Sequence, residues 1–330
     1  MKSACKKIVC FLFAAAFILV LSGSLFVYKK THPAISVVMS VYNSEKYLDD
    51  AIQSVLTQTF GDFEFIIVND ASTDNSQKII DKYAASDNRI RTFQNAKNSG
   101  AAATRNEGLR HIRGKYTLVI DSDDALMSNA LKTSYLFAEH DNLDMFIFCP
   151  IAFNAQTKQF EFMPMLNQKY IQKRNLRIFN ISDIYERTFQ LTLLQPWNKF
   201  IRSDIIKNNH LRFASHPYHD DAYFVFMAMI NAKRISFTWE QLYLYRLNRK
   251  GSQTDKFSET AKMLGKLDAA KAIYKEMQKR NFPAIAYVRM NGWLAENNYP
   301  LADQSAFAQT QKFMTEVRKY YTSLRAESAN

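Results

Sequence analysis

The sequence contains little cysteine, which forms disulfides and zinc sites, and little glycine, which makes chains flexible. Only three of its 330 residues are cysteine and eight are glycine. Three cysteines cannot form a disulfide framework, and no cysteine and histidine cluster has the spacing of a zinc site. So few glycines leave little room for flexible linkers, and no internal repeat or low-complexity tract is present. A hydrophobic fraction of 47% with 22% charged residues is typical of a folded globular protein.

Acidic residues are also fewer than basic ones. Forty-three lysines and arginines against 31 aspartates and glutamates give a formal net charge of +12. Such an excess fits a phosphorylated substrate, an anionic lipid surface or a nucleic acid, and equally a lysine-rich solvated surface. No zinc-finger spacing or RNA-binding signature accompanies the charge. We therefore expect no nucleic-acid partner.

The longest uncharged run covers residues 8–27 and is flanked by lysines. A helix of about 20 residues spans about 30 Å, the thickness of a hydrocarbon core. A cleaved signal peptide is the alternative, but its apolar core is about 7–15 residues long and Ser22-Gly23-Ser24 is a weak cleavage site. We expect residues 1–30 to form a single-pass membrane anchor. The basic residues on both flanks leave its orientation open.

From Pro33 to Asn154, short apolar runs alternate with segments of helical periodicity. The pattern predicts strands over 34–41, 63–68, 90–93, 116–120 and 144–153, and helices after Ser44 and over 74–85, 100–112 and 128–140. This alternation implies right-handed crossovers and a mostly parallel sheet, that is, an α/β fold. In such sheets ligands bind beyond the carboxyl ends of the strands, where polar residues follow each run here.

The second half of the sequence is less regular. It predicts a basic loop over 168–177, helices over 182–193, 203–209 and 220–231, and strands over 235–239 and 242–245. After Asp255 the pattern is amphipathic helix in about three pieces. We therefore expect an α/β domain over residues 33–254, followed by a helical C-terminal extension over residues 255–330.

Acidic and basic side chains follow the predicted strands. Asp121 and Asp123 end one strand, and alternate residues of an extended chain share a side, so the two carboxylates can converge on Mg²⁺ or Mn²⁺. Asp70 ends another strand and can accept hydrogen bonds from a uracil or a ribose. Arg105, near the start of a helix, favours a diphosphate. For both acidic motifs the alternative is a turn that caps the following helix.

Four ordered segments carry a family resemblance. They are AISVVMSVYNSEKYLDDAIQSVLTQTF (34–60), FEFIIVNDASTDNS (63–76), NSGAAATRNEGL (98–109) and GKYTLVIDSDD (114–124). The sequence resembles family-2 glycosyltransferases of GT-A fold. Trp197-Asn198-Lys199, His219-Asp220-Asp221 and Tyr245-Arg246 resemble later segments of members that build bacterial surface polysaccharides. The resemblance spans about residues 33–254, with a nucleotide-sugar-binding half over 33–154 and an acceptor and catalytic half over 155–254.

The resemblance implies a role for each matching residue. It places Tyr42, Glu45, Asp70, Asn98, Arg105, Asp121 and Arg246 around the nucleotide sugar, Asp123 and Asp121 at the metal, and Trp197, Asn198 and Lys199 near the acceptor. It makes Asp221 the catalytic base with Asp220 beside it. Ser40, Ala71 and Asp220 depart from the residues most common in the family, and only the departure at Asp220 bears on the choice of base.

The implied activity is inverting transfer of a sugar, supported by Mn²⁺ or Mg²⁺, from a nucleotide donor to a hydroxyl of a glycan or lipid-linked glycan. UDP is the usual nucleotide in the family. The implied process is synthesis of a cell-surface polysaccharide or lipopolysaccharide, with the catalytic domain facing the cytosol, where activated sugars are made. Two alternatives remain open: a catalytically inactive GT-A domain that binds glycans, and a nucleotidyltransferase.

Overall fold

The computed structural model describes residues 32–163, 167–214, 219–248, 258–295 and 304–327. The predicted membrane anchor lies outside these ranges. Within them, no helix combines the length and the apolar character needed to cross a membrane. The described residues from Ala34 onward form one compact unit.

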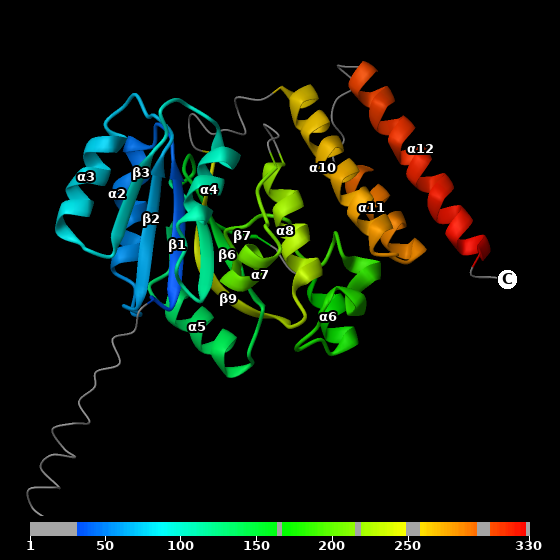
Figure 1. Cartoon of the computed structure of the whole chain (residues 1–330), viewed down its shortest axis with the longest axis horizontal. Helices are drawn as coiled ribbons and strands as arrows, with labels where there is room; N and C mark the ends of the chain where they lie inside the picture. Colours follow the sequence, from blue (N-terminus) through cyan, green and yellow to red (C-terminus); the bar gives the residue numbers. More distant parts are fainter. Residues whose placement is uncertain (1–31, 164–166, 215–218, 249–257, 296–303, 328–330) are drawn as a thin grey trace, which may run out of the picture. The chain divides into compact units, whose positions relative to one another are not determined.

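Apolar runs of the first half form the parallel part of a nine-stranded sheet (Figure 1). The parallel strands are β1 (Ile35–Val41), β2 (Phe63–Asn69), β3 (Ile90–Gln94) and β4 (Tyr116–Asp121), in the spatial order β3-β2-β1-β4. The helices between them are α2 (Glu45–Leu56), α3 (Ser76–Ser86) and α4 (Ala101–Arg110). Each follows its strand as the sequence pattern predicts, so the carboxyl ends of β1, β2 and β4 meet at one edge.

The second half of the sheet is mixed. Strand β8 (Lys199–Arg202) lies antiparallel between β4 and β6 (Met145–Asn154), and β9 (Ile235–Leu247) pairs parallel with β6. The short strands β5 (Ala125–Leu126) and β7 (Phe160–Phe162) pair antiparallel with β9 and β6. The result is a mixed, mostly parallel sheet with helices on both faces, which confirms the predicted α/β architecture.

Two apolar cores lie on opposite faces of the sheet, and alternate side chains of β1 enter each of them. Val37 and Met39 belong to the core that includes residues of α2, α3 and α5 (Ala130–His140), whereas Val38 belongs to the core that includes α4, α7 (Ser203–Asn208) and α8 (Asp220–Asn231). Because both faces are covered, β1 is almost continuously apolar instead of alternating with polar residues.

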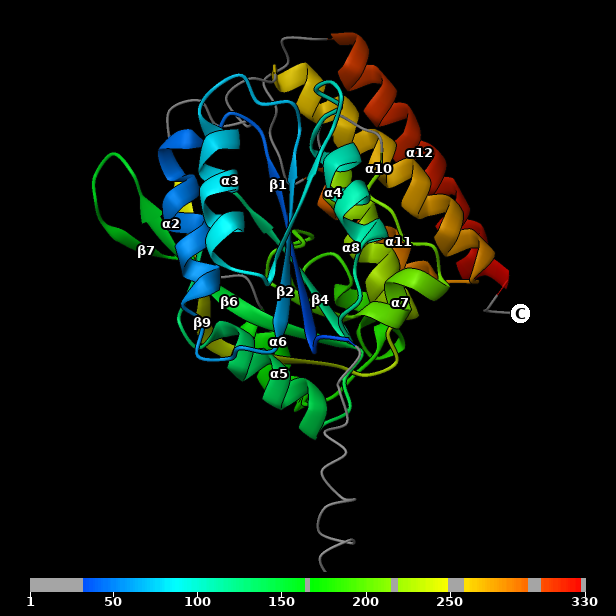
Figure 2. The ribbon, with the colours of Figure 1, turned by 60° about the vertical axis from the view of Figure 1, so that its left-hand side comes forward.

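Three C-terminal helices form a further layer outside α8 (Figure 2). They are α10 (Glu259–Lys279), α11 (Ala284–Ala295) and α12 (Gln304–Glu327). Helix α10 packs on α8, and α12 packs on α10 and α11. Their buried side chains, among them Tyr287 and Val317, continue the core that surrounds α8. The predicted helical extension is therefore present and shares a core with the α/β domain.

Three predictions in the second half are wrong in detail. The predicted loop at 168–177 contains helix α6 (Gln168–Arg174), which Asn167 caps through the Tyr170 N–H and which ends at Asn175 in the left-handed conformation. The predicted helix at 182–193 is only a kinked 3₁₀ segment, η1 (Ile181–Arg187). The two strands at 235–245 are one strand, because irregular register against β6 absorbs the apparent break.

Candidate active site

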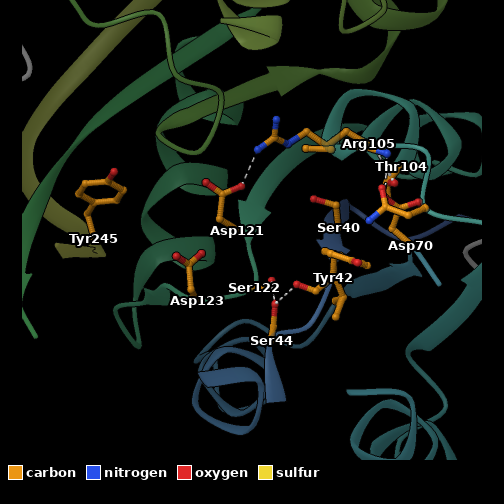
Figure 3. A pocket seen from close by; sticks show the side chains of 14 residues that line it. Ser40, Tyr42, Ser44, Asp70, Thr104, Arg105, Asp121, Ser122, Asp123 and Tyr245 are labelled. Carbon is orange, nitrogen blue, oxygen red and sulfur yellow. Dashed lines mark hydrogen bonds and ion pairs between the residues drawn. The ribbon is translucent and has the colours of Figure 1, made fainter. Parts of the chain in front are cut away.

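The principal pocket opens at the carboxyl ends of β1, β2 and β4 (Figure 3). It is lined by Ser40, Val41, Tyr42, Ser44, Asp70, Asn98, Gly100, Ala101, Thr104, Arg105, Asp121, Ser122, Asp123 and Tyr245. The structure thus brings together six residues that the sequence predicted for the nucleotide sugar and the metal: Tyr42, Asp70, Asn98, Arg105, Asp121 and Asp123.

Asp70 organises the loop that enters α4. Its Oδ1 accepts hydrogen bonds from the Ser99 N–H (2.8 Å) and from Nδ2 of Asn95 (2.7 Å), and its Oδ2 accepts one from the Gly100 N–H (2.9 Å). Gly100 has a φ of +86°, which a residue with a side chain rarely adopts. Asp70 is only 2% exposed, so in this structure both carboxylate oxygens are already engaged by the protein.

Glu45 lies outside the pocket lining, although the resemblance places it at the nucleoside. Its Oε2 accepts hydrogen bonds from the backbone N–H and from Nδ2 of Asn75, both at 2.9 Å. In the opposite direction, the Glu45 N–H donates a hydrogen bond of 3.0 Å to Oδ2 of Asp74. Since unpaired N–H groups at a helix start attract carboxylates, Glu45 joins the beginnings of α2 and α3.

Arg105 connects the two acidic sides of the site. Its guanidinium forms ion pairs of 2.9 Å with Asp121, at the end of β4, and of 2.9 Å with Asp220, at the start of α8. It also stacks over the ring of Phe213, 5.3 Å from the ring centroid. Burial alone lowers the pKa of Arg105, but the charges of Asp121 and Asp220 outweigh it and raise the pKa, so the guanidinium stays charged.

Asp123 and Asp121 lie near each other beyond the end of β4 (Figure 3). Asp124 points away and is 2% exposed, because Tyr243 Oη donates to it (2.9 Å), as does the Arg246 N–H (2.7 Å). Burial and the neighbouring charges of Asp123 and Asp121 raise the pKa of Asp124 well above its usual range. Asp124 therefore ties the acidic turn to β9 and leaves Asp123 in the pocket.

Arg246 anchors the same turn from β9. Its Nε donates to the Asp123 carbonyl oxygen at 2.8 Å, and its guanidinium stacks over the ring of Tyr47 at 4.8 Å. Arg246 also forms an ion pair of 3.5 Å with Asp50 and lies over the ring of Phe153, 5.9 Å from its centroid. Arg246 thus lies next to Asp123 with its side chain held by protein groups, and its contact with the nucleotide sugar stays a prediction.

Asp220 and Asp221 begin helix α8 in a partly buried position. Burial and the charge of Asp220 raise the pKa of Asp221 to about 7, against the opposing charge of Arg105. Burial also raises the pKa of Asp220, although the direct ion pair with Arg105 opposes that rise. Of the two acids, Asp220 is the one engaged by Arg105, and Asp221 has a pKa suited to accepting a proton near neutral pH.

Trp197, Asn198 and Lys199 lie beneath the site instead of lining it. They are 3%, 0% and 0% exposed. Trp197 stacks on Tyr243 and Tyr245 with centroid distances of 4.7 and 5.3 Å, and Asn198 donates to the Phe148 carbonyl. Lys199 donates to Thr192, to the Leu193 carbonyl and to Asn198, and burial lowers its pKa to about 7. In this structure the triplet supports the site from below, and a contact with the acceptor stays a prediction.

Sequence reasoning assigned no pocket role to four residues that shape it. Ser44 and Ser122 share a hydrogen bond of 2.7 Å across its floor, and Tyr243 and Tyr245 support or line it from β9. The two tyrosines are two residues apart on a strand and therefore project from the same face. That period-2 spacing was visible in the sequence, whereas the pairing of Ser44 with Ser122 depends on tertiary contacts.

A divalent metal fits this site only together with a phosphorylated substrate. Among the residues that the structure describes, no group of three or more His, Cys, Asp or Glu side chains is arranged to hold an ion. The pocket does present two carboxylates, Asp123 and Asp121, and Arg105 engages one oxygen of the second. Mg²⁺ is commonly held by one or two carboxylates with substrate phosphates completing its coordination.

Comparison with known sequences identifies the family. Residues 36–209 match Glycosyl transferase family 2. The chain belongs to this family. It is a glycosyltransferase, and its curated relatives include glycosyltransferase GlyG of Streptococcus pneumoniae, 29% identical over 66% of this chain and 72% of GlyG. The poly(ribitol-phosphate) beta-glucosyltransferase of Bacillus spizizenii is also 29% identical, over 66% of this chain but only 33% of that longer protein.

Solved structures share the fold of this family-2 member. S. aureus TarS 1-349 in complex with UDP-GlcNAc aligns with a TM-score of 0.68 and 22% identity over 86% of this chain and 80% of that one. The mannosyltransferase PcManGT of Pyrobaculum calidifontis, in complex with GDP-Man and Mn²⁺, aligns with a TM-score of 0.55 and 12% identity over 89% of this chain and 84% of that one. At these identities the likeness establishes the GT-A fold.

Proposed function

We propose that this glycosyltransferase moves a sugar from a UDP-linked donor to a hydroxyl of a glycan or lipid-linked glycan, with inversion at the anomeric carbon and with the help of Mn²⁺ or Mg²⁺. The observation that carries the proposal is the double ion pair of Arg105. It brings the carboxylates at the end of β4 within reach of the acids at the start of α8. Asp220 and Asp221 are not among the residues that line the pocket, but Arg105 lines it and pairs with Asp220, which connects the start of α8 to the donor groups.

The donor would lie along the carboxyl edge of the sheet. Tyr42, Asp70 and Asn98 line the end of the pocket toward β2 and would contact the nucleoside. Asp123, with Asp121, would hold a divalent cation against the diphosphate, and such a cation neutralises charge that builds on a leaving phosphate. Arg246 of β9 donates to the Asp123 carbonyl and would approach the diphosphate from that side.

Asp221 would act as the general base. It would accept the proton of the acceptor hydroxyl as that oxygen attacks the anomeric carbon and the bond to the nucleoside diphosphate breaks. A pKa near 7 leaves a sizeable fraction of the carboxylate ionised at neutral pH while keeping it basic enough to take the proton. Asp220 would instead position the helix start through its 2.9 Å pair with Arg105.

The proposed donor and process rest on relatives. The fold is shared with a TarS structure that contains UDP-GlcNAc, and a curated relative is named as a poly(ribitol-phosphate) beta-glucosyltransferase. These likenesses, with the motifs that resemble surface-polysaccharide enzymes, support a UDP-sugar and a cell-surface polymer such as a polysaccharide or teichoic acid. The +12 charge suits a phosphorylated donor or acceptor.

The experiment is a donor panel. The purified full chain is incubated with Mn²⁺, glycan acceptors and a set of nucleotide sugars, and release of nucleoside diphosphate is measured. UDP release that increases with one acceptor is the expected result. Pyrophosphate release from a nucleoside triphosphate would instead establish a nucleotidyltransferase. Glycan binding without turnover of any donor would leave the inactive, binding-only alternative.

We also propose that residues 8–27 anchor the enzyme in the membrane by a single pass, with the catalytic unit facing the cytosol. The proposal is supported by the uncharged run itself and by the cytosolic supply of activated sugars. Fractionation of cells that express the full chain or residues 31–330 tests the anchor. Protease accessibility of the catalytic unit in intact cells tests the orientation. Degradation by protease added outside the cells would show that the catalytic unit faces outward and would contradict the proposal.

A further inference from the structure

The C-terminal helices contact the helix that carries the two acids of the site. They lie outside the family match, which ends at residue 209. Helix α8 begins immediately after His219, whose φ of +58° is unusual for a residue with a side chain. Such a backbone conformation persists only where the surroundings hold it. The groups that surround His219 therefore bear directly on where Asp220 and Asp221 point.

Helices α10 and α11 supply those groups. The ring of Trp293, in α11, meets the ring of His219 edge to face, with centroids 6.2 Å apart and planes inclined by 79°. Lys266, in α10, donates through Nζ to the Trp293 carbonyl at 2.5 Å and lies over the Trp293 ring, 5.0 Å from its centroid. Trp293 is 9% exposed and Lys266 is 3% exposed. Two helices of the extension thus converge on the residue that precedes Asp220.

The same helices hold the rest of α8. Trp293 stacks on Phe189, which stacks on Phe226 in the middle of α8, each with a centroid distance of 5.5 Å. Phe282, between α10 and α11, also contacts Phe226, at 6.1 Å. At the far end, Arg280 donates to Oδ1 of Asn231 at 3.2 Å. Contacts at the start, middle and end restrict both rotation and sliding of α8.

We propose that the C-terminal helical layer positions the catalytic base, and that Trp293 is its principal positioning residue. The proposal rests on the proposed function, in which Asp221 takes the acceptor proton. The direction of a helical side chain follows the rotation of its helix, so a rotation of α8 would turn the Asp221 carboxylate away from the acceptor hydroxyl. A displacement of about 1 Å at a catalytic group can cost about 100-fold in rate.

The backbone of the donor side is held by the sheet, although Arg105 links Asp121 to Asp220. Asp70 follows β2, Asp121 ends β4 and Asp123 comes two residues later, and pairing with β1 sets the positions of both strands. Loss of the Trp293 contact should therefore lower kcat and leave the KM for the donor nearly unchanged. A general loss of folding would instead reduce the amount of active enzyme and the protection of the whole sheet.

The test compares Trp293→Ala, Trp293→Phe and the control Phe307→Ala in the full chain. Phe307 lies on α12, is 40% exposed and belongs to the same helical layer. The measurements are kcat, donor KM, and amide hydrogen exchange of α8 and of β1. We expect about a tenfold fall in kcat for Trp293→Ala with donor KM within about twofold. Faster exchange should be confined to the first turns of α8. Trp293→Phe, which keeps a ring against His219, should recover most of kcat, and Phe307→Ala should match the parent.

Parental kcat and parental exchange at the start of α8 in Trp293→Ala would overturn the proposal, even if the parent enzyme transfers sugar as expected. A uniform rise in exchange across α8 and β1, with no recovery in Trp293→Phe, would also overturn it in favour of a purely structural role. If the parent enzyme shows no transfer, the proposed function fails. Hydrogen exchange alone then decides whether Trp293 holds the start of α8.

Discussion

The two acidic sides of the proposed site are positioned by different kinds of structure. Asp121 is the last residue of β4 and Asp123 comes two residues later, and β4 pairs parallel with β1 over six residues of register. Asp220 and Asp221 begin α8, a helix that takes no part in the sheet. It is held by α10 and by Phe189, which stacks on Phe226 of α8 and on Trp293 of α11. Backbone pairing in the sheet therefore positions Asp121 and Asp123. Side-chain packing from distant segments positions Asp220 and Asp221.

Arg105 is the residue at which these two sides meet. One guanidinium nitrogen pairs with Asp121 and another with Asp220, both at 2.9 Å. Because the planar guanidinium has a fixed fork geometry, it sets the spacing of the two carboxylates as well as neutralising them. Substitutions on each side and at Arg105 therefore separate chemistry, metal binding and assembly of the site.

The largest effect is expected on the helix side. Asp221→Asn removes the proposed base, so turnover should fall by about 10²–10⁴ while donor affinity stays near the parental value. Asp220→Asn, its neighbour, should lose less turnover because it acts through orientation. Steady-state kinetics and donor titration measure both variants. Near-parental turnover in Asp221→Asn would remove it as the base and leave both acids as helix caps.

The next effect is expected on the strand side. Asp123→Asn halves the carboxylates available to a divalent ion in the pocket, so transfer should fall by about 10²–10³ with the fold intact. EDTA should reproduce the loss in the parent enzyme. Asp81→Asn, the same change at an exposed position on α3, is the control. Full transfer in EDTA would take the metal out of the reaction.

Arg105→Met should affect stability as well as activity. It leaves the carboxylates of Asp121 and Asp220 uncompensated in a largely buried position, which should cost about 3–5 kcal/mol in the free energy of unfolding. Arg110→Met, on the same helix but paired only with Glu107 at the surface, should cost little.

Denaturant unfolding at pH 8 and at pH 4 tests the origin of this loss. Protonation of Asp121 and Asp220 at pH 4 removes their uncompensated charges, so Arg105→Met should lower the free energy of unfolding less at pH 4 than at pH 8. Equal losses for Arg105→Met and Arg110→Met would show that the bridge contributes nothing to stability.

The smallest expected effect is a gain in stability from Asp221→Asn. Burial raises the pKa of Asp221 from its ordinary 3.8 to about 7, so the folded state binds more protons than the unfolded chain between these values. The parental free energy of unfolding therefore falls as pH rises from about 4 to about 7. The asparagine variant lacks this decline. Its melting temperature should exceed the parental one at pH 8 and equal it at pH 4, and parental turnover should rise with pH through about 7.

A melting temperature for Asp221→Asn that is lower than the parental one at pH 8 would contradict the raised pKa. It would mean that the carboxylate is stabilised by its surroundings, in the manner of an acid paired with Arg105. If Asp221 is a buried base, Asp221→Asn should lower turnover but raise the melting temperature at pH 8. If Asp221 is a helix cap, the same substitution should lower the melting temperature.

The sequence by itself determined the parallel half of the fold and the family. Strand and helix periodicity is local, so runs such as 34–41 and 63–68 predicted β1 and β2 to within a residue or so at each end. Parallel strands place their carboxyl ends at one edge, which put Asp70, Asp121 and Asp123 in one pocket before any contact was known.

Only the tertiary structure decided how these parts are joined. The short strand β8 inserts antiparallel between β4 and β6, and four residues carry too little periodicity to reveal it. Tertiary contacts also bury Trp197, Asn198 and Lys199 beneath the pocket, divert Glu45 to the start of α3, and pair Arg105 with an acid 115 residues away. Burial and ion pairing depend on which distant groups meet, and spacing along a chain carries no record of that.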